Sequence, residues 1–173
     1  MPTTSVSRPI HATQQQVWDL LSDLEHAARW NKAWTRIDFT STQHHGVGTT
    51  FRAAMEGTIQ TFDFEVCDWS APDRIAFCPI READESYSIE LEQHTFEVRA
   101  LSDTESEVTI TARASVHGIR GIVMGTFFWA GHQRQGLDYA LDSIQEIFQP
   151  ELFADRDEDP LLPDPALEPS SEE

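Results

Sequence analysis

The residue best placed to do chemistry in this sequence is His94. It alternates with Phe96 and Val98 along a stretch of period two, whereas Glu97 and Arg99 occupy the opposite parity. Charged side chains belong on the wet face of a half-buried strand, so His94 should point into the interior. A neutral imidazole there could orient a ligand hydroxyl or act as a general base, and it could equally be a histidine that only fills the core.

Which side chains share the interior face with His94 depends on whether the strand is regular. If the strand is regular, Glu90 and Glu92 join the imidazole and form an acid and base cluster. If the strand carries a β-bulge, Ile89 and Leu91 point inward instead. Two unpaired carboxylates inside a core are costly, so we expect the bulge.

Other motifs of catalysis and of cofactor binding are absent from the sequence. It has no phosphate-binding loop, nucleophile elbow, zinc signature or dinucleotide fingerprint, and Gly46-Val47-Gly48 reads as a turn. His44 and His45 are neighbours on an extended chain and point opposite ways, so a shared metal is not expected. His132 and Arg134 are further polar candidates near the C-terminus. We expect neither a metal nor a cofactor.

The elements that would position His94 follow from hydrophobic periodicity. Thr13 and Gln16 form a capping box that starts a helix running to about Leu24, and a second short helix is predicted over 25–30. After Trp34 the period changes to two, which predicts an antiparallel meander. Bulges near both ends of the strand that contains Phe62, Phe64 and Val66 would bring Ile59 and Trp69 to its inner face. The alternating apolar positions of the other strands are Ile37 and Phe39, then Phe51, Ala53 and Met55, then Ile75 and Phe77, and finally Val108, Ile110, Ala112, Ala114 and Val116.

A long helix is predicted over 118–148. In its second half Leu137, Leu141, Ile144 and Phe148 share one helical face, and acidic residues take the other side. Glycines recur along this segment at 121, 125, 131 and 136. They either leave room beside the helix for a ligand, or they mark a ragged helix start near Thr126.

Composition limits the classes of partner. The 173 residues carry a net charge of −18, which repels nucleic acid and anionic membranes, so we expect no nucleic-acid binding. No apolar run is long enough to be a secretory signal or a membrane span, so we expect a cytoplasmic protein without stable membrane insertion. Five prolines and nine acids follow residue 149, so we expect a domain over 1–149 and a disordered acidic tail over 150–173.

Cys67 and Cys78 flank a predicted turn at Pro72-Asp73. A two-residue loop there would place the two cysteines directly opposite each other across a hairpin. Because disulfides are rare in the cytosol, we expect reduced thiols.

Several local signatures resemble the START-like superfamily, also called the polyketide cyclase/dehydrase and lipid transport group. The resemblance covers about residues 4–148, although Ala71 stands where the family often has a second proline and the tail has no family counterpart. The matching stretches are Ile10-His11-Ala12-Thr13, Val17-Trp18-Asp19-Leu20-Leu21-Ser22-Asp23, Trp30-Asn31, Gly46-Val47-Gly48 and Asp68-Trp69-Ser70-Ala71-Pro72-Asp73-Arg74-Ile75.

The resemblance implies an α+β helix-grip fold, in which a strand, two short helices and six strands form a curved antiparallel sheet around the C-terminal helix. It also implies a hydrophobic cavity between sheet and helix. We therefore expect binding of a small hydrophobic molecule, lipid-like or polyketide-like, in a carrier or sequestering role. The alternative is a polyketide cyclase or dehydratase that uses His94 as a general base. Aromatic and apolar side chains are the predicted ligand contacts: Trp30, Phe51, Phe62, Phe64, Phe77, Phe96, Met124, Phe127, Phe128 and Trp129.

Overall fold

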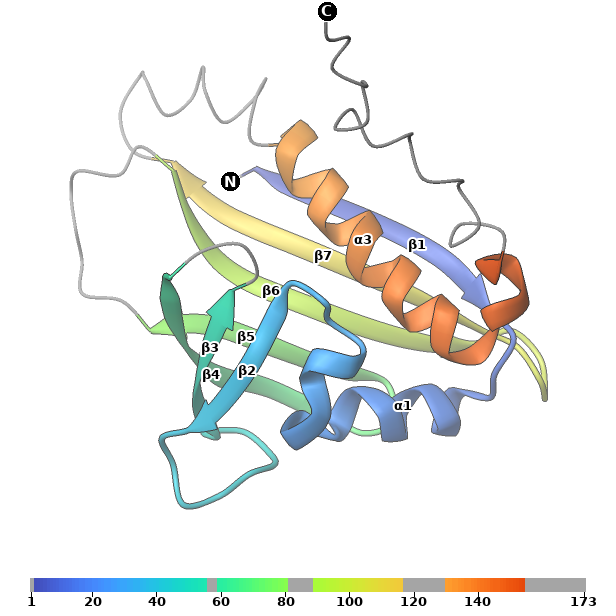
Figure 1. Cartoon of the computed structure of the whole chain (residues 1–173), viewed down its shortest axis with the longest axis horizontal. Coiled ribbons are helices and arrows are strands. Elements are labelled where there is room, and N and C mark those ends of the chain that lie inside the picture. The colour runs from blue at the N-terminus through green and yellow to red at the C-terminus, as the bar shows by residue number, and fades with distance from the viewer. Residues whose placement is uncertain (1, 56–58, 81–88, 117–129, 155–173) are drawn as a thin grey trace, which may run out of the picture.

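The computed structural model describes residues 2–55, 59–80, 89–116 and 130–154 (Figure 1). Along the chain, helices and strands follow the order that the periodicity predicts. The elements are β1 (Thr3–Ile10), α1 (Gln14–Ser22), η1 (Leu24–Arg29), β2 (Trp34–Phe39), β3 (Thr50–Met55), β4 (Thr61–Ser70), β5 (Arg74–Ile80), β6 (Ile89–Ala100), β7 (Ser106–Val116), α3 (Ala130–Phe148) and η3 (Pro150–Leu152).

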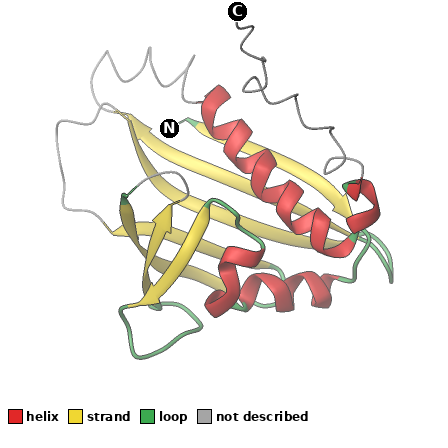
Figure 2. Ribbon diagram, in the orientation of Figure 1, coloured by secondary structure: helices red, strands yellow, loops and turns green. Residues whose placement is uncertain are grey.

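The strands form one antiparallel sheet of seven strands in the order β1-β7-β6-β5-β4-β3-β2. The sheet curves, α3 runs along β1 and β7, and α1 and η1 cover one end (Figures 1 and 2). This architecture confirms the expected α+β helix-grip fold. Its consequence for function is that the inner face of the sheet and α3 enclose a common interior.

The capping box starts α1 as predicted. The hydroxyl of Thr13 accepts a hydrogen bond from the backbone N–H of Gln16 at 3.2 Å, and the Gln16 side chain accepts one from the Thr13 N–H at 2.9 Å. The second short helix is a 3₁₀ helix, η1, and it is kinked at His26. It brings Trp30 to the interior, where the indole is completely buried.

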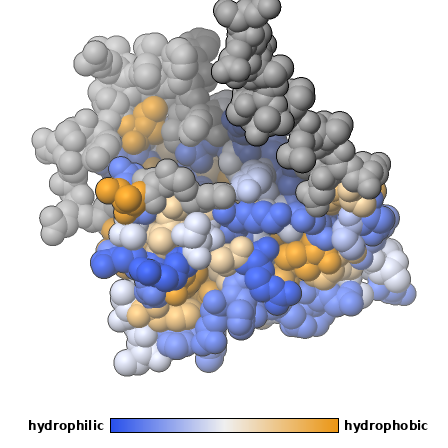
Figure 3. Space-filling view, viewed as in Figure 1, coloured by the Kyte–Doolittle hydropathy of each residue, from blue (hydrophilic) through white to orange (hydrophobic). Residues whose placement is uncertain are grey.

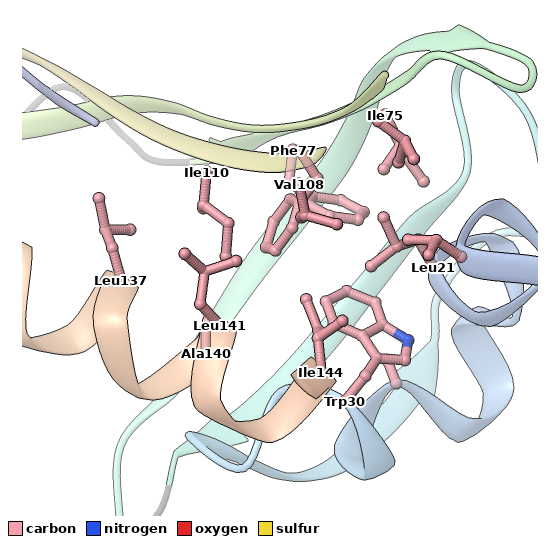
Figure 4. Close-up of a cluster of buried hydrophobic side chains, with 14 of the residues drawn as sticks. Leu21, Trp30, Ile75, Phe77, Val108, Ile110, Leu137, Ala140, Leu141 and Ile144 are labelled. Carbon is pink, nitrogen blue, oxygen red and sulfur yellow. The ribbon is translucent and has the colours of Figure 1, made fainter. Parts of the chain in front are cut away.

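The C-terminal helix buries the predicted face. Leu141 and Ile144 are completely buried and Leu137 is 3% exposed. Figure 4 shows these side chains pointing from α3 toward Ile110 and Phe77 of the sheet. The part of the predicted helix before residue 130, with the glycines at 121 and 125, lies outside the described residues. The helix therefore anchors the core through its second half, as expected.

Basic side chains hold the acidic face of α3 against neighbouring elements. Arg8 of β1 forms an ion pair with Asp142, and its Nη1 also donates to Oε1 of Gln145 at 3.1 Å. Lys32, between η1 and β2, pairs with Glu146. These contacts tie α3 to the first strand and to the segment that precedes β2.

The predicted bulge in β6 is confirmed. The register with β7 shifts between Leu91 and Gln93, so the bulge residue is Glu92. Leu91 pairs with the fully buried Ala114 and packs against the core. Glu92 instead forms an ion pair with Arg113, with 3.2 Å between Oε2 and Nε. The bulge thus keeps the carboxylate away from the core, for the reason of burial cost given above.

The strand β4 carries one bulge, between Val66 and Asp68. It brings Trp69 to the inner side, where its ring meets that of Trp18 with centroids 5.4 Å apart. The second bulge, expected near Ile59, is wrong: β4 begins at Thr61, and Ile59 is fully exposed before the strand.

The expected cysteine geometry is also wrong. The β4–β5 loop has three residues, Ala71–Asp73, and Cys67 is the bulge residue rather than the partner of Cys78, which pairs with Glu65. Both cysteines lie on the outer side of the sheet, because each follows a completely buried residue, Val66 before Cys67 and Phe77 before Cys78. Cys67 and Cys78 form a disulfide with 5.9 Å between their Cα atoms, which corrects the expectation of reduced thiols.

The described chain extends to residue 154, past the predicted domain boundary at residue 149. The 3₁₀ helix η3 continues the described chain, and the Leu152 N–H donates to the carbonyl of Gln149 at 3.2 Å. The domain boundary at residue 149 and the disordered tail after it stay predictions. The acidic remainder, 155–173, lies outside the described residues.

Candidate functional site

A largely apolar cavity of about 280 Å³ lies between α3 and the inner face of the sheet. The strands β2, β3, β4, β6 and β7 contribute its floor, and α3 contributes Gln133, Gly136, Leu137 and Ala140 at the spacing of one helical face. The remaining lining residues are Asn31, Ala33, Trp34, Met55, Phe62, Phe64, Leu91, His94, Phe96 and Ile110. Its volume lies near the lower end of the range of small-molecule sites, roughly 300–1,000 Å³, and well above the voids of an ordinary core.

His94 lies in this cavity, as its parity predicts. It pairs with Phe77 of β5 and with Ala112 of β7 in the centre of the sheet. The side chain as a whole is partly buried, but the Nε2 atom is fully buried and has no hydrogen-bond partner in the protein. Native structures seldom leave such an atom unpaired, so this nitrogen is available to a ligand.

The electrostatic state of His94 follows from its surroundings. Burial lowers the pKa of His94 to about 4, and the neighbouring side chain of Gln133 opposes this with a smaller effect. The imidazole is consequently neutral at neutral pH. One ring nitrogen of a neutral imidazole donates a hydrogen bond and the other accepts one.

The predicted aromatic contacts divide into two groups. Phe62, Phe64 and Phe96 line the cavity. Trp30, Phe51 and Phe77 are buried in the hydrophobic core but do not line the cavity. Met124, Phe127, Phe128 and Trp129 lie outside the described residues.

Trp34 lines the cavity and connects these two groups of aromatic residues, although the periodicity did not identify it as a site residue. Its ring contacts Phe64 of the cavity at a centroid distance of 5.7 Å, and it contacts Phe51 at 5.6 Å and Phe77 at 5.8 Å behind the cavity. Trp34 is separated from Ile37 and Phe39 by an odd number of positions, yet it faces the same side of β2 because a bulge lies between Trp34 and Arg36. The cavity wall is therefore backed by a continuous aromatic cluster, which gives it a rigid shape.

Gln133 was also not predicted as a site residue. It precedes Leu137 by four residues and so lies on the same face of α3, which is a signal that the sequence contained. Arg134, by contrast, is exposed and lies 3.9 Å from Asp138 on the same helix. The side chain of His132 lies outside the described part of the chain.

A second depression of about 520 Å³ opens on the outer surface beside the β4–β5 loop. It is larger, but charged residues line it and both of its arginines pair with acids of the same lining: Arg74 lies 3.9 Å from Glu97, and Arg99 lies 2.9 Å from Glu107. On the face viewed in Figure 3, hydrophilic residues likewise cover most of the described surface. The internal cavity, with its unpaired nitrogen, is the stronger candidate site. The described residues contain no cluster that could hold a metal ion.

Comparison with known proteins agrees with this geometry. The family model described as polyketide cyclase/dehydrase and lipid transport matches residues 1–146. The chain belongs to this family. The match spans every element that surrounds the cavity and confirms the family resemblance drawn from the sequence motifs.

Solved structures with a similar fold carry different names. A norcoclaurine synthase point mutant from Thalictrum flavum, in complex with a transition-state analogue, superimposes with a TM-score of 0.66 at 11% identity and covers 87% of this chain and 95% of its own. The di-domain ARO/CYC protein BexL from the BE-7585A biosynthetic pathway gives 0.68 at 14% identity over 88% of this chain and 49% of its own. The Aha1 dimer from Colwellia psychrerythraea gives 0.62 at 15% identity over 86% and 97%.

At these identities the similarity establishes the fold and not the activity. No curated protein matches the sequence. Within the described residues, no helix is both long and apolar enough to cross a membrane.

Proposed function

We propose that this protein binds a small hydrophobic molecule in the cavity between α3 and the sheet, as a carrier or sequestering protein. The observation that carries the proposal is the cavity of about 280 Å³ with its apolar lining and one unpaired polar atom, Nε2 of His94. Binding sites for small molecules combine an apolar surface with a few placed polar groups. The family and its structural neighbours support a ligand-binding role for this fold.

Dye binding to a matched pair of helix variants tests this proposal. Gly136 lines the cavity, whereas Gly131, five residues earlier on α3, does not, and both glycines are exposed. An extra Cβ meets no atom within 4 Å at either position, so the backbone leaves room for a side chain to start there. Circular dichroism checks that both leucine variants are folded. An uncharged naphthalene-based dye should bind the native protein and the Gly131→Leu variant about one to one, and Gly136→Leu should weaken its binding.

Native mass spectrometry of the purified protein gives an independent readout, because a copurifying small molecule would appear as added mass. Binding of the dye only to heat-damaged protein, or equally to both leucine variants, would contradict the proposal. In that case the aromatic residues would form a filled core and nothing more.

A polyketide cyclase or dehydratase activity is the second candidate, because His94 lies in the cavity, but the surroundings of the imidazole weaken it. A general base works best when its pKa lies near the operating pH, and the pKa of His94 is about 4. Its cavity neighbour is an amide, Gln133, rather than a carboxylate that would raise its basicity. The geometry therefore supports ligand binding better than proton transfer.

Kinetics separate the two functions. If His94 is a general base, the substitution His94→Phe should lower turnover of a cyclisable polyketide mimic by about 10²-fold or more while binding is retained. If His94 contributes only to binding, ligand affinity should change instead and no turnover should depend on it.

A further inference from the structure

The polar groups of the cavity select among hydrophobic ligands by charge. Three lining residues are polar, namely Asn31, His94 and Gln133, and none of the described lining residues is charged at neutral pH. No arginine or lysine lines the cavity among the residues that the structure describes. A buried carboxylate needs a paired cation or several hydrogen-bond donors, and this lining supplies no cation.

The charge of the whole chain acts in the same direction. A net charge of −18 gives the protein a negative potential that opposes the approach of an anion. An anionic ligand would thus be disfavoured both on approach and in the bound state.

The unpaired Nε2 atom specifies the polar group that a ligand should carry. In a neutral imidazole this nitrogen either accepts a hydrogen bond or donates one, depending on the tautomer. A hydroxyl group can do both, so it satisfies Nε2 of His94 in either tautomer. An ether oxygen can only accept a hydrogen bond, so it satisfies Nε2 in one tautomer, and a hydrocarbon satisfies it in neither.

The cavity volume limits the size of the ligand. An apolar cavity of about 150 Å³ accommodates benzene, and the cavity here measures about 280 Å³. Two fused rings with one small substituent fit this space, whereas a long acyl chain exceeds it.

We infer that the cavity binds an uncharged hydroxylated molecule of about two rings, held by a hydrogen bond to Nε2 of His94, and that it rejects carboxylates of the same size. This inference rests on the proposed binding function and names its ligand class. His94 is then the residue that determines specificity.

Three naphthalenes of similar size test the inference on the full-length protein by titration calorimetry at pH 7. They carry at one position a hydroxyl (2-naphthol), a methyl group (2-methylnaphthalene) or a carboxylate (2-naphthoate). Because a buried donor or acceptor left unpaired is costly, 2-naphthol should bind about tenfold or more tightly than 2-methylnaphthalene. The carboxylate 2-naphthoate should bind more weakly than both.

Variants assign the preference to His94. In His94→Phe the preference for 2-naphthol over 2-methylnaphthalene should disappear, while 2-methylnaphthalene still binds. The control His45→Phe replaces an exposed histidine that does not line the cavity and should retain the preference. The comparison of the three ligands on the unmodified protein does not depend on whether the His94 variant folds.

The outcomes separate the inference from the function on which it rests. If none of the three ligands binds, the proposed function itself fails. If 2-methylnaphthalene binds as tightly as 2-naphthol, or 2-naphthoate binds as tightly as either, the cavity is a binding site but the inferred selectivity is wrong. Retention of the hydroxyl preference in His94→Phe would also overturn the inference.

Discussion

Gln133 of α3 lies beside His94 of β6 inside the cavity, so one polar contact connects the closing helix to the centre of the sheet. The two residues are 39 positions apart in the chain. His94 faces the cavity because side chains alternate along β6, and Gln133 does so because it lies on the same face of α3 as Leu137. Burial lowers the pKa of His94, and the amide of Gln133 offsets a part of that effect. The site is thus an apolar cavity with a neutral polar end.

Stability should depend on pH through His94. Its pKa is about 4 in the folded protein and about 6.5 in the unfolded chain, so the unfolded state binds more protons between these values. The free energy of unfolding should therefore decrease as the pH falls from 6.5 toward 4, by up to roughly 3 kcal/mol in total. Urea unfolding at a series of pH values measures this change.

The variant His94→Phe isolates the contribution of the imidazole, because Phe cannot be protonated. Between pH 6.5 and 4.5 its stability should decrease less than that of the wild-type protein. All other ionisable groups are common to both proteins and cancel in the difference. Parallel pH profiles would show that His94 is protonated alike in the folded and unfolded states.

Gly136 offers a stabilising substitution that also reports on the cavity. A glycine inside a helix is less stable than alanine by about 0.5–1 kcal/mol, and a Cβ at this position meets no atom within 4 Å. Gly136→Ala should therefore raise the free energy of unfolding by about that amount, as measured by chemical denaturation. A loss of stability would mean that the space beside this glycine is already filled.

Much of the cavity could be predicted because it depends on local periodicity. The parity of His94 with Phe96 and Val98 placed the imidazole on the inner face, and the cost of burying Glu92 predicted the bulge in β6. Both arguments concern one strand and its two faces. The closing helix was also predicted from its periodicity, whereas the curved sheet wrapped around it followed from the family resemblance, which the family match confirms.

The features that were missed depend on register and on helix phase. Trp34 reaches the cavity only because a bulge separates it from the parity of Ile37 and Phe39. Gln133 could have been found by extending the stripe of Leu137 back by four residues, but the glycines obscured the phase of the helix. A single polar residue in such a stripe carries no hydrophobic signal.

The cysteine pair shows the same limitation more sharply. Whether Cys67 can reach Cys78 depends on a three-residue loop and a bulge, and both shift the register by one position. Such a cross-link is rare in cytosolic proteins, so the cytoplasmic location stays a prediction.

The disulfide yields a prediction of its own. The two cysteines are separated by 11 positions in the sequence. The loop-closure entropy that the bond removes from the unfolded chain predicts that it stabilises the folded protein by about 2–3 kcal/mol. Reduction under native conditions, or the double substitution of Cys67 and Cys78 by Ser, should lower the free energy of unfolding by about this amount. Intact mass under denaturing, non-reducing conditions should be about 2 Da below that of the reduced chain, since forming one disulfide removes two hydrogens.

The double variant serves as the control for reduction. Its stability should not change on addition of a reductant, because it has no bond to lose. Free thiols detected in the purified protein before reduction would contradict the pairing.

The network around Arg8 should contribute more than an ordinary surface ion pair. Arg8 is 27% exposed, it pairs with Asp142 and Gln145, and its Nη2 lies 3.8 Å from Asp138. Arg8→Met keeps most of the aliphatic stem, removes the charge and takes away one ionic partner of Asp138 and of Asp142, which lie one turn apart on α3. We expect a loss of about 1–2 kcal/mol in the free energy of unfolding, measured by urea denaturation.

A second arginine provides the matched comparison for Arg8. Arg36 lies 2.8 Å from Asp38 on the same strand, and its side chain is 69% exposed. Water and salt screen such a pair, so Arg36→Met should change stability by less than about 0.5 kcal/mol. High salt should reduce the loss in Arg8→Met only in part, since that network is partly shielded from solvent. Equal effects in the two variants would show that Arg8 does not hold α3 on the sheet, and the grip on the helix would then rest on Leu137, Leu141 and Ile144.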